Sequence, residues 1–269
     1  MGAVEGHWSQ DGLLAYQAMA PAYDAFTAHH NYDLWLGHML PKLEQHGLAG
    51  DRLLDAACGT GKSFLPMRRR GWTVTGTDIS PAMIDVARAK VAGDDGVELG
   101  VADLRELPVL GEFDLVWALA DAVNYLLDPD ELVAALAGLG RNLAPTGLLV
   151  FDTNTLQTYR TFFAEEEVVD GGDCRLIWKG RTAPNAPAGV LAEATFEAEP
   201  IEPGGGGRRI PPTLHRERHF PEADVRAALE RAGLVLLGVY GHHYDAIPHQ
   251  PLDEDHDIKA IYIAAAELA

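Results

Sequence analysis

The sequence has few cysteines and no long apolar run. Its two cysteines, Cys58 and Cys174, provide no disulfide framework, which is typical of a reducing compartment. No apolar stretch approaches the roughly 18 residues that span a bilayer. Residues 1–10 have neither a basic start nor an apolar block, so the pattern predicts no secretory signal. We therefore expect a cytoplasmic protein that does not act at a membrane.

Basic residues are also scarce. The chain has 21 Lys and Arg against 40 Asp and Glu, and its formal net charge is −19. Such a surface repels phosphate backbones, whereas nucleic-acid binders usually present a basic face. Nucleic acid is therefore a poor substrate candidate, and a neutral or cationic small molecule fits better. The 269 residues suit one α/β domain with an insertion, and a homodimer is left open.

Residues 1–47 predict an N-terminal helical cap. Apolar and aromatic residues recur at helical spacing through 16–23 and 34–43. Pro21 and the stretch 27–31 are expected to break this region into two helices and to offer hinge points. The cap is interpreted either as static cover for the core or as a lid over an active site.

Residues 48–160 alternate between strand and helix patterns. Strands are expected at 52–57, 72–77, 97–102, 113–120 and 147–152, and helices at 62–70, 81–90 and 129–143. The strand at 113–120 is almost free of polar residues, as in a parallel strand covered on both faces. The alternation predicts an α/β fold with a doubly wound parallel sheet.

The alternation stops in residues 161–220. Strands without intervening helices are expected at 174–181, 190–199 and 213–220, which predicts an inserted antiparallel β meander. Residues 204–207 are four glycines and suggest a mobile loop tip, and the acidic run 165–167 is interpreted as a solvated face. In residues 221–269 a helix at 221–232 and strands at 235–240 and 258–264 are expected to complete the core.

The segment 55–61, Asp-Ala-Ala-Cys-Gly-Thr-Gly, is the most informative motif. A strand ends here, and two glycines let the backbone turn close to a ligand before a helix begins. Asp78 ends the next strand, where a carboxylate can accept both hydroxyl protons of a ribose. These features suit any adenosine-containing cofactor. Phe64 occupies the third glycine position of a dinucleotide site, which counts against NAD.

The motifs together resemble those of the class I S-adenosylmethionine (SAM)-dependent methyltransferases. Leu53–Gly61 is similar to their first motif, Thr77–Met83 to the second, Asp103-Leu104 to the third, Phe113–Val116 to the fourth, and Leu139–Phe151 to the segment around the fifth strand. The resemblance is close over residues 45–155. It implies SAM as the cofactor and a seven-stranded, Rossmann-like methyltransferase sheet whose last strand is antiparallel.

The resemblance also implies the places of the cofactor-binding residues. Asp55 and Gly59 would lie by the methionine part, with Gly61 shaping the loop; Asp78 would hold the ribose; Ile79 would pack on the adenine face; Asp103 would accept from the adenine amino group, flanked by Leu104; and Ala118 to Asp121 would line the passage to the methyl group. Ala57 of the first motif and Met83 of the second are also counted among the cofactor-binding residues. Tyr23 resembles a tyrosine that closes over the methionine end.

The segment around Tyr23, residues 121–126 and the meander resemble the small-molecule branch of the family, which includes sugar N-methyltransferases and glycine-type N-methyltransferases. Asn124 stands near the place of a histidine in some members, so a mechanism through that histidine does not transfer. The predicted reaction is methyl transfer to nitrogen or oxygen of a small-molecule acceptor. A hydroxyl acceptor needs a general base, and the candidate catalytic residues are Asp121, His215, His219, His242 and His243.

Alternative interpretations remain beside this one. The chain is alternatively a protein that binds SAM without methylating, or an NAD-dependent oxidoreductase, against which Phe64 argues. His242 and His243 are adjacent on a strand and point to opposite faces, so we expect no metal site. His215 and His219 share one strand face, and we expect them to be solvated rather than directed into the pocket.

Overall fold

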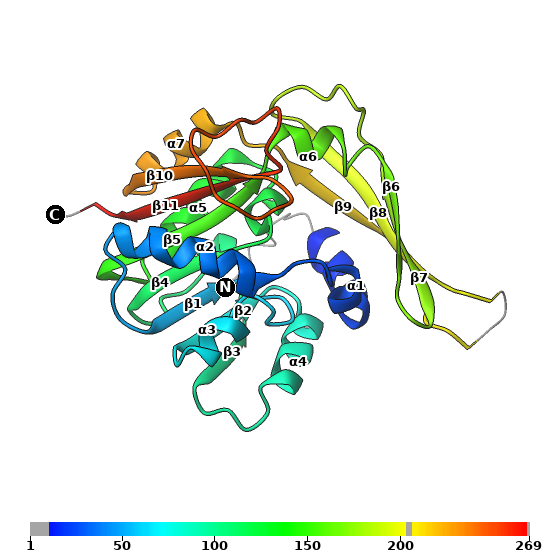
Figure 1. The fold of residues 1–269 in the computed structure, drawn as a ribbon, viewed down its shortest axis with the longest axis horizontal. Helices are drawn as coiled ribbons and strands as arrows, with labels where there is room; N and C mark the ends of the chain where they lie inside the picture. Colours follow the sequence, from blue (N-terminus) through cyan, green and yellow to red (C-terminus); the bar gives the residue numbers. More distant parts are fainter. Residues whose placement is uncertain (1–10, 203–205, 268–269) are drawn as a thin grey trace, which may run out of the picture.

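The computed structural model describes residues 11–202 and 206–267 and contains two sheets (Figure 1). The larger has seven strands in the order β10-β11-β5-β4-β1-β2-β3. They are β1 (Arg52–Ala56), β2 (Thr73–Asp78), β3 (Val97–Val101), β4 (Phe113–Ala118), β5 (Leu143–Asn154), β10 (Leu234–His242) and β11 (Lys259–Ala266). Strands β1 to β5 pair in parallel, and β11 runs antiparallel to both β5 and β10. The predicted Rossmann-like methyltransferase fold is confirmed.

Helices cover both faces of this sheet, because apolar side chains along each strand point alternately to one face and to the other. Leu54 of β1 packs on the face covered by α5 (Pro129–Gly140) and α7 (Glu222–Arg231). Its neighbour Leu53 packs on the opposite face with α2 (Tyr32–Gln45), α3 (Leu65–Arg69) and α4 (Pro81–Lys90). Two-sided burial of this kind leaves the carboxyl edge of the strands as the place for a ligand.

The cap consists of α1 (Asp11–Phe26) and α2, but its break differs from the prediction. The helix α1 continues through Pro21, and the chain leaves helical geometry only after Phe26. Met19 and Ala22 are buried on either side of the proline, so tertiary packing holds the helix across the lost hydrogen bond. Asn31 then caps α2 by accepting from the Leu34 amide at 3.0 Å.

The second sheet has four antiparallel strands in the order β6-β7-β8-β9. They are β6 (Glu166–Asp170), β7 (Cys174–Gly180), β8 (Leu191–Pro200) and β9 (Ile210–Arg218). The acidic run 165–167 is thus partly an edge strand, a location that tolerates charge because one side of the strand faces water. The prolines that open β9 are accommodated because β9 is the other edge. The predicted loop tip at 204–207 lies partly outside the described residues.

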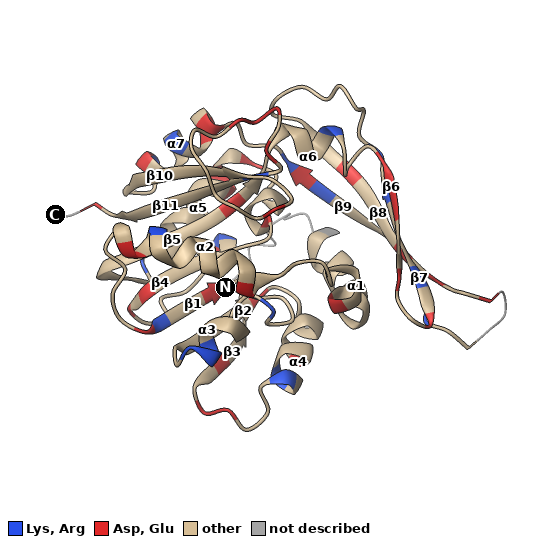
Figure 2. Ribbon diagram, viewed as in Figure 1, with Lys and Arg blue, Asp and Glu red and all other residues tan. Residues whose placement is uncertain are grey.

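This meander projects from the main sheet beside α1 (Figure 1). One face packs on α1 and on α6 (Leu156–Arg160), a short helix that the sequence analysis did not predict, through Phe26, Trp178 and Phe196. Residues of both charge signs lie on neighbouring strands of this sheet (Figure 2). On the other face, Arg216 lies 2.8 Å from Glu193, and Lys179 pairs with Glu197. The charges of this face therefore neutralise one another locally.

Other element boundaries differ modestly from the predictions. The helix after the glycine motif covers only α3, and β5 begins four residues before the predicted strand and ends two residues after it. Within the described part of the chain, no helix is long and apolar enough to cross a bilayer.

Candidate functional site

A pocket lies at the carboxyl ends of β1, β2 and β4, with α1 on its other side. Its lining combines apolar and aromatic side chains with a few polar groups, as in a small-molecule site. Eight of the predicted cofactor-binding residues line it: Tyr23, Ala57, Gly59, Asp78, Ile79, Met83, Asp103 and Leu104. Segments far apart in the sequence therefore converge on one cavity.

The glycine turn is built around Asp78. Ala57, Gly59 and Gly61 all have positive φ, at 71°, 53° and 86°. The Gly59 amide donates to one Asp78 oxygen at 2.9 Å, and the Ser80 amide donates to the other at 2.8 Å. Burial raises the pKa of Asp78 to about 6, and the two amides oppose this rise. Each oxygen keeps acceptor capacity for a hydroxyl donor.

Gly61 and Phe64 are in close contact, and the size of each residue depends on the other. A Cβ atom on Gly61 would lie 2.7 Å from the Phe64 ring, which is fully buried. Glycine is therefore required by both its backbone angle and the close approach of the ring. Phe64 fills the space that a third glycine would leave open.

Asp55, Gly61 and Ala118 do not line the pocket. Asp55 is fully buried, and its Oδ2 accepts from Ser63 Oγ at 2.5 Å. Ser63 does line the pocket, so Asp55 positions a wall residue from behind. Burial raises the pKa of Asp55 to about 7.

Asp103 belongs to a small ionic cluster at the pocket wall. It caps the 3-10 turn η1 (Leu104–Glu106) and accepts from the Arg105 guanidinium at 2.5 Å. Arg105 also lines the pocket and lies 3.6 Å from Glu131. The sequence analysis missed Arg105, because nothing in the spacing distinguishes it from a surface arginine.

Four tyrosines line the pocket: Tyr16, Tyr23 and Tyr32 from the cap, and Tyr125 from η2 (Ala122–Tyr125). Burial raises the pKa of all four, and the charge of Asp121 raises each further. The sequence analysis assigned only Tyr23 to the cofactor. The seven-residue spacing of Tyr16 and Tyr23 on one helix face was the available signal for a second pocket tyrosine.

Asp121 lies behind this wall, between two lining residues, Ala120 and Ala122. It has left-handed backbone geometry, with φ at 56°, and its amide donates to Asp152 at 2.8 Å. Its carboxylate pairs with Lys259, which lies 3.5 Å from Asp152 as well. Burial raises the pKa of Asp121, and Lys259 opposes this rise. Asp121 is thus an ion-paired carboxylate beside the pocket.

Glu217 adds a second carboxyl group to this region. It is buried and accepts from Asn154 at 2.7 Å and from Tyr159 at 3.0 Å. Burial raises its pKa well above the usual range, and the nearby charge of Asp121 adds to the rise. The sequence analysis did not single out Glu217, because its role depends on where β9 packs.

The expectation that His215 and His219 are solvated is wrong. Both are only 1% exposed, because the inner face of β9 packs against the cap and α6. The Nδ1 atom of His215 lies 2.8 Å from the hydroxyl of Tyr125. His215 therefore stands directly behind a pocket residue, although it does not line the pocket itself.

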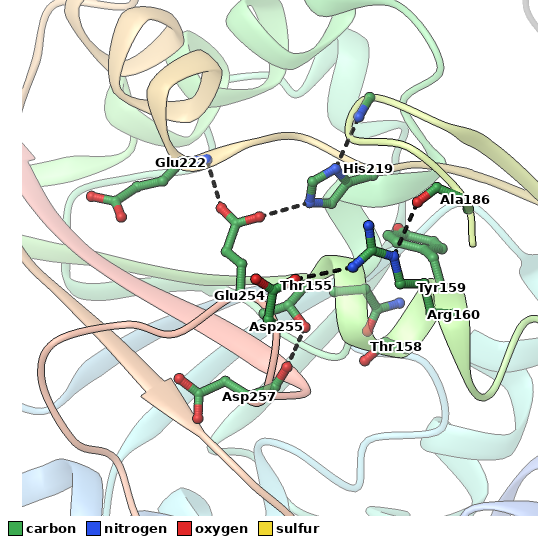
Figure 3. A network of polar contacts seen from close by, with 12 residues as sticks. Thr155, Thr158, Tyr159, Arg160, Ala186, His219, Glu222, Glu254, Asp255 and Asp257 are labelled. Atoms are coloured by element: carbon green, nitrogen blue, oxygen red, sulfur yellow. Dashed lines mark hydrogen bonds and ion pairs between the residues drawn. The ribbon is translucent and has the colours of Figure 1, made fainter. Parts of the chain in front are cut away.

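His219 lies elsewhere, in the network of Figure 3. Its Nδ1 accepts from the Gly189 amide at 3.0 Å, and its Nε2 lies 3.0 Å from Glu254, whose other oxygen accepts from the Glu222 amide. Arg160 and Asp255 pair at 3.0 Å in the same network. This network links the end of the meander to α6, to the start of α7 and to the loop before β11.

His242 and His243 are absent from the pocket lining. The Nδ1 of His242 lies 2.8 Å from the His243 carbonyl, and His243 is exposed. Across residues 11–202 and 206–267, no group of three or more His, Cys, Asp or Glu side chains is arranged to hold a metal ion. The pocket is therefore the strongest candidate site.

Comparison with known proteins agrees with this geometry. A family model described as a methyltransferase domain matches residues 53–147. YqeM of Bacillus subtilis (strain 168), named as a methyltransferase without a stated substrate, is 29% identical over 237 residues, covering 87% of this chain and 92% of YqeM. A dTDP-3-amino-3,4,6-trideoxy-alpha-D-glucopyranose N,N-dimethyltransferase of Streptomyces venezuelae is 27% identical over 183 residues, which is 68% of this chain and 74% of that enzyme.

A solved structure shares the fold over nearly the whole chain. It is an S-adenosylmethionine-dependent methyltransferase from Clostridium acetobutylicum ATCC 824, with a TM-score of 0.75 and 22% identity, covering 93% of this chain and 98% of that one. The sheet order, the motifs and these matches agree. The chain is a class I SAM-dependent methyltransferase, and S-adenosylmethionine is its cofactor.

Proposed function

We propose that this enzyme methylates a nitrogen atom of a small molecule and acts in the cytoplasm. The observation that carries the choice of nitrogen is the chemistry of the pocket wall near Tyr125, where tyrosines lie in the field of buried carboxyl groups. Such a wall favours a ligand group that donates hydrogen bonds or bears positive charge. Both free cysteines are buried, which supports a reducing compartment.

The proposed cofactor contacts use the lining residues. Asp78 accepts from the ribose hydroxyls, Ile79 and Met83 contact the adenine face, and Asp103 accepts from the adenine amino group. The turn at Ala57 and Gly59 brings backbone amides to the methionine part, and Tyr23 closes over it from α1. The meander covers the acceptor side through β9, since Arg216 lines the pocket.

The chemistry of nitrogen and oxygen acceptors differs in the need for a base. A neutral amine attacks the methyl carbon with its lone pair, the C–N bond forms, and the C–S bond breaks to leave a thioether. The positive charge moves from sulfur to nitrogen, and no proton has to leave during the displacement. A hydroxyl acceptor must lose its proton, so a base of suitable pKa has to reach it.

The side chains beside the pocket are poorly suited to that second task. Among the described residues that line the pocket there is no histidine. His215 lies one step behind, and burial lowers its pKa to about 4. Asp121 is engaged by Lys259. Nitrogen methylation asks only for alignment and exclusion of water, which is worth roughly 7–11 kcal/mol.

The Streptomyces venezuelae relative, an N,N-dimethyltransferase by name, supports this choice. The test is turnover on a panel of matched small amines and alcohols, for example amino sugars and the corresponding hydroxy sugars, with the demethylated cofactor product measured. We expect turnover on amines and none above background on alcohols. Turnover on alcohols alone would reject nitrogen as the target. Cofactor binding without turnover on any member would favour a protein that binds SAM without methylating.

A further inference from the structure

Two pocket tyrosines and one buried histidine pack together at one side of the pocket. Tyr16 and Tyr125 both line the pocket, and their rings meet edge to face with centroids 5.2 Å apart. The Tyr125 hydroxyl lies 2.8 Å from Nδ1 of His215, which comes from β9 of the meander. This cluster joins the cap, the end of β4 and the meander, and its hydrogen bond runs between Tyr125 and His215.

The surroundings of His215 determine which nitrogen carries its proton. Its Nε2 atom is buried and has no hydrogen-bond partner among the described residues. The ring lies among aromatic side chains, with centroid distances of 5.1 Å to Trp178, 5.7 Å to Tyr16 and 6.5 Å to Phe196. An N–H group is attracted to aromatic faces, whereas a nitrogen lone pair is repelled by them. The proton therefore belongs on Nε2, and Nδ1 accepts.

This tautomer orients the hydroxyl proton of Tyr125. Because Nδ1 of His215 accepts, the Tyr125 hydroxyl donates to it. Its proton then points toward His215, and its oxygen keeps the remaining lone pairs for a ligand. Burial keeps His215 neutral near pH 7 by lowering its pKa to about 4, so the direction of this hydrogen bond is stable in that range.

A nearby carboxylate strengthens the accepting character of this wall. The charge of Asp121 raises the pKa of both Tyr16 and Tyr125. The same negative field attracts a group with positive or partly positive hydrogen atoms. The wall is thus matched to an amine N–H and mismatched to a group that only accepts hydrogen bonds.

We propose that the Tyr125 hydroxyl, oriented by His215, accepts a hydrogen bond from the N–H of the amine acceptor and so restricts methylation to primary and secondary amines. This rests on the proposed nitrogen methylation. A secondary amine has one N–H and one lone pair. Holding the N–H on a tyrosine oxygen directs the lone pair toward the methyl carbon. The new C–N bond replaces the C–S bond, and the N–H proton stays on nitrogen until the product leaves. A neutral tertiary amine has no N–H for this wall, so methylation stops there.

The hydrogen bond can be measured without methyl transfer. The probes are trimethylammonium and tetramethylammonium ions, titrated by calorimetry or NMR into the protein loaded with S-adenosylhomocysteine. The two ions have the same charge, and only the first has an N–H. We expect the wild-type protein to favour trimethylammonium by about tenfold, the scale of one charge-assisted hydrogen bond. Tyr125→Phe, which keeps the ring, should lose most of this preference and so controls for the size difference of the ions.

His215 is a positioning residue in this proposal, and its variants test the direction of its hydrogen bond with Tyr125. His215→Leu removes the acceptor and frees the Tyr125 proton to turn toward the ligand, so the preference should fall as it does in Tyr125→Phe. His215→Asn places an oxygen near the position of Nδ1 and should restore most of it. Combining Tyr125→Phe with His215→Leu should lower the preference no further than Tyr125→Phe alone, since both act on one interaction.

Several outcomes overturn the proposal. An equal preference in the wild type and Tyr125→Phe does so, as does binding of neither ion at tens of millimolar. If His215→Asn is no better than His215→Leu, the orienting role of His215 is wrong. If a His215 variant fails to fold, Tyr125→Phe still decides the main point. Failure of the proposed function is distinct, because it appears as absent amine turnover while the ion preference persists.

Discussion

Asp78 has the most direct residue-scale test. Its two carboxylate oxygens hold the Gly59 and Ser80 amides and keep acceptor capacity toward the pocket. Asp78→Ala removes a charge-assisted acceptor, each bond of which is worth roughly 1.5–3 kcal/mol. Calorimetry should show SAM affinity reduced by at least about tenfold. Asp78→Asn, which retains one acceptor oxygen, should lose less. Unchanged affinity in the alanine variant would contradict the ribose assignment.

The same carboxyl group predicts a pH dependence. Burial raises the pKa of Asp78 to about 6 in the free protein, and ribose hydroxyls donate best to the charged form. Below that pH, binding has to expel a proton, so SAM affinity should fall as the pH drops and level off above about 7. Asp55, with a pKa of about 7, also titrates in this window but does not line the pocket.

Titrations of SAM binding between pH 5 and 8 measure this effect. Asp78→Asn should flatten the change near pH 6, and any dependence that remains in that variant belongs to Asp55 or to another group. If the wild-type affinity is constant through this range, Asp78 is already ionised in the free protein, and the buried environment is weaker than its contacts suggest.

Glu217 offers a test of a buried neutral acid. Burial raises its pKa well above the usual range, which favours the protonated carboxyl group, so we expect Glu217→Gln to preserve its shape and its charge state. Glu217→Ala leaves the Asn154 amide without this acceptor, at about 1–3 kcal/mol for a buried unsatisfied group, and leaves Tyr159 only its longer bond to the Arg218 carbonyl. Chemical denaturation should show a large loss in the free energy of unfolding for alanine and a small one for glutamine. Equal losses would indicate a carboxylate that is charged in the fold.

At the scale of elements, α1 is held against the cofactor loops by polar contacts. Asp24 accepts from Thr60 at 2.5 Å and pairs with Lys90 at 2.5 Å, and Gln17 lies 3.1 Å from Ser80. Thr60 and Ser80 belong to the loops that we propose hold SAM, so binding and closure of α1 should be coupled. A lid has to contact the loops over which it closes, and α1 does so through Asp24 and Gln17.

Hydrogen exchange on α1 distinguishes a lid from a static cap. We expect the amides of α1 to gain protection when SAM binds, because the ordered glycine turn strengthens the contact with Asp24. Asp24→Ala should reduce that gain and speed SAM dissociation, while Asp85→Ala, an exposed acid on the same side of the fold, serves as the matched control. Equal protection of α1 in the free and bound protein would identify a static cap.

Hydrogen bonds join the end of the meander directly to the core. Arg218 accepts from Asn124 through its carbonyl, and His219 lies in the network that reaches α7 (Figure 3). Deleting residues 161–220 would therefore remove core contacts together with the acceptor wall. Point substitutions on β9 can change the pocket wall without removing the core contacts, whereas the deletion removes both.

At the scale of the whole molecule, ligand binding should raise thermal stability. A ligand present at 100 times its Kd adds about 2.7 kcal/mol to the free energy of unfolding. For a chain of this size we expect an increase in Tm of about 5–10 °C with SAM. NADH at the same concentration is the control, and we expect no shift, because Phe64 fills the third glycine position of a dinucleotide site. A shift with NADH alone would contradict the assigned cofactor.

The sequence by itself determined the class of fold and most of the residues that line the proposed cofactor end of the pocket. Those features are local: strands alternate with helices, and Gly59, Gly61 and Asp78 stand at strand ends. A parallel sheet brings such ends to one edge whatever the rest of the chain does. Backbone angles and strand termini are short-range properties, so residue spacing was enough to predict them.

Only the tertiary structure decided what lies on the proposed acceptor side. Whether His215 faces water or Tyr125 depends on how β9 packs against α1, and residue spacing within β9 is the same in both cases. The continuity of α1 through Pro21 and the approach of Glu217 to Asn154 likewise depend on partners more than 60 residues away or on packing around them. Burial then sets the pKa of each group, because removal from water disfavours the charged form.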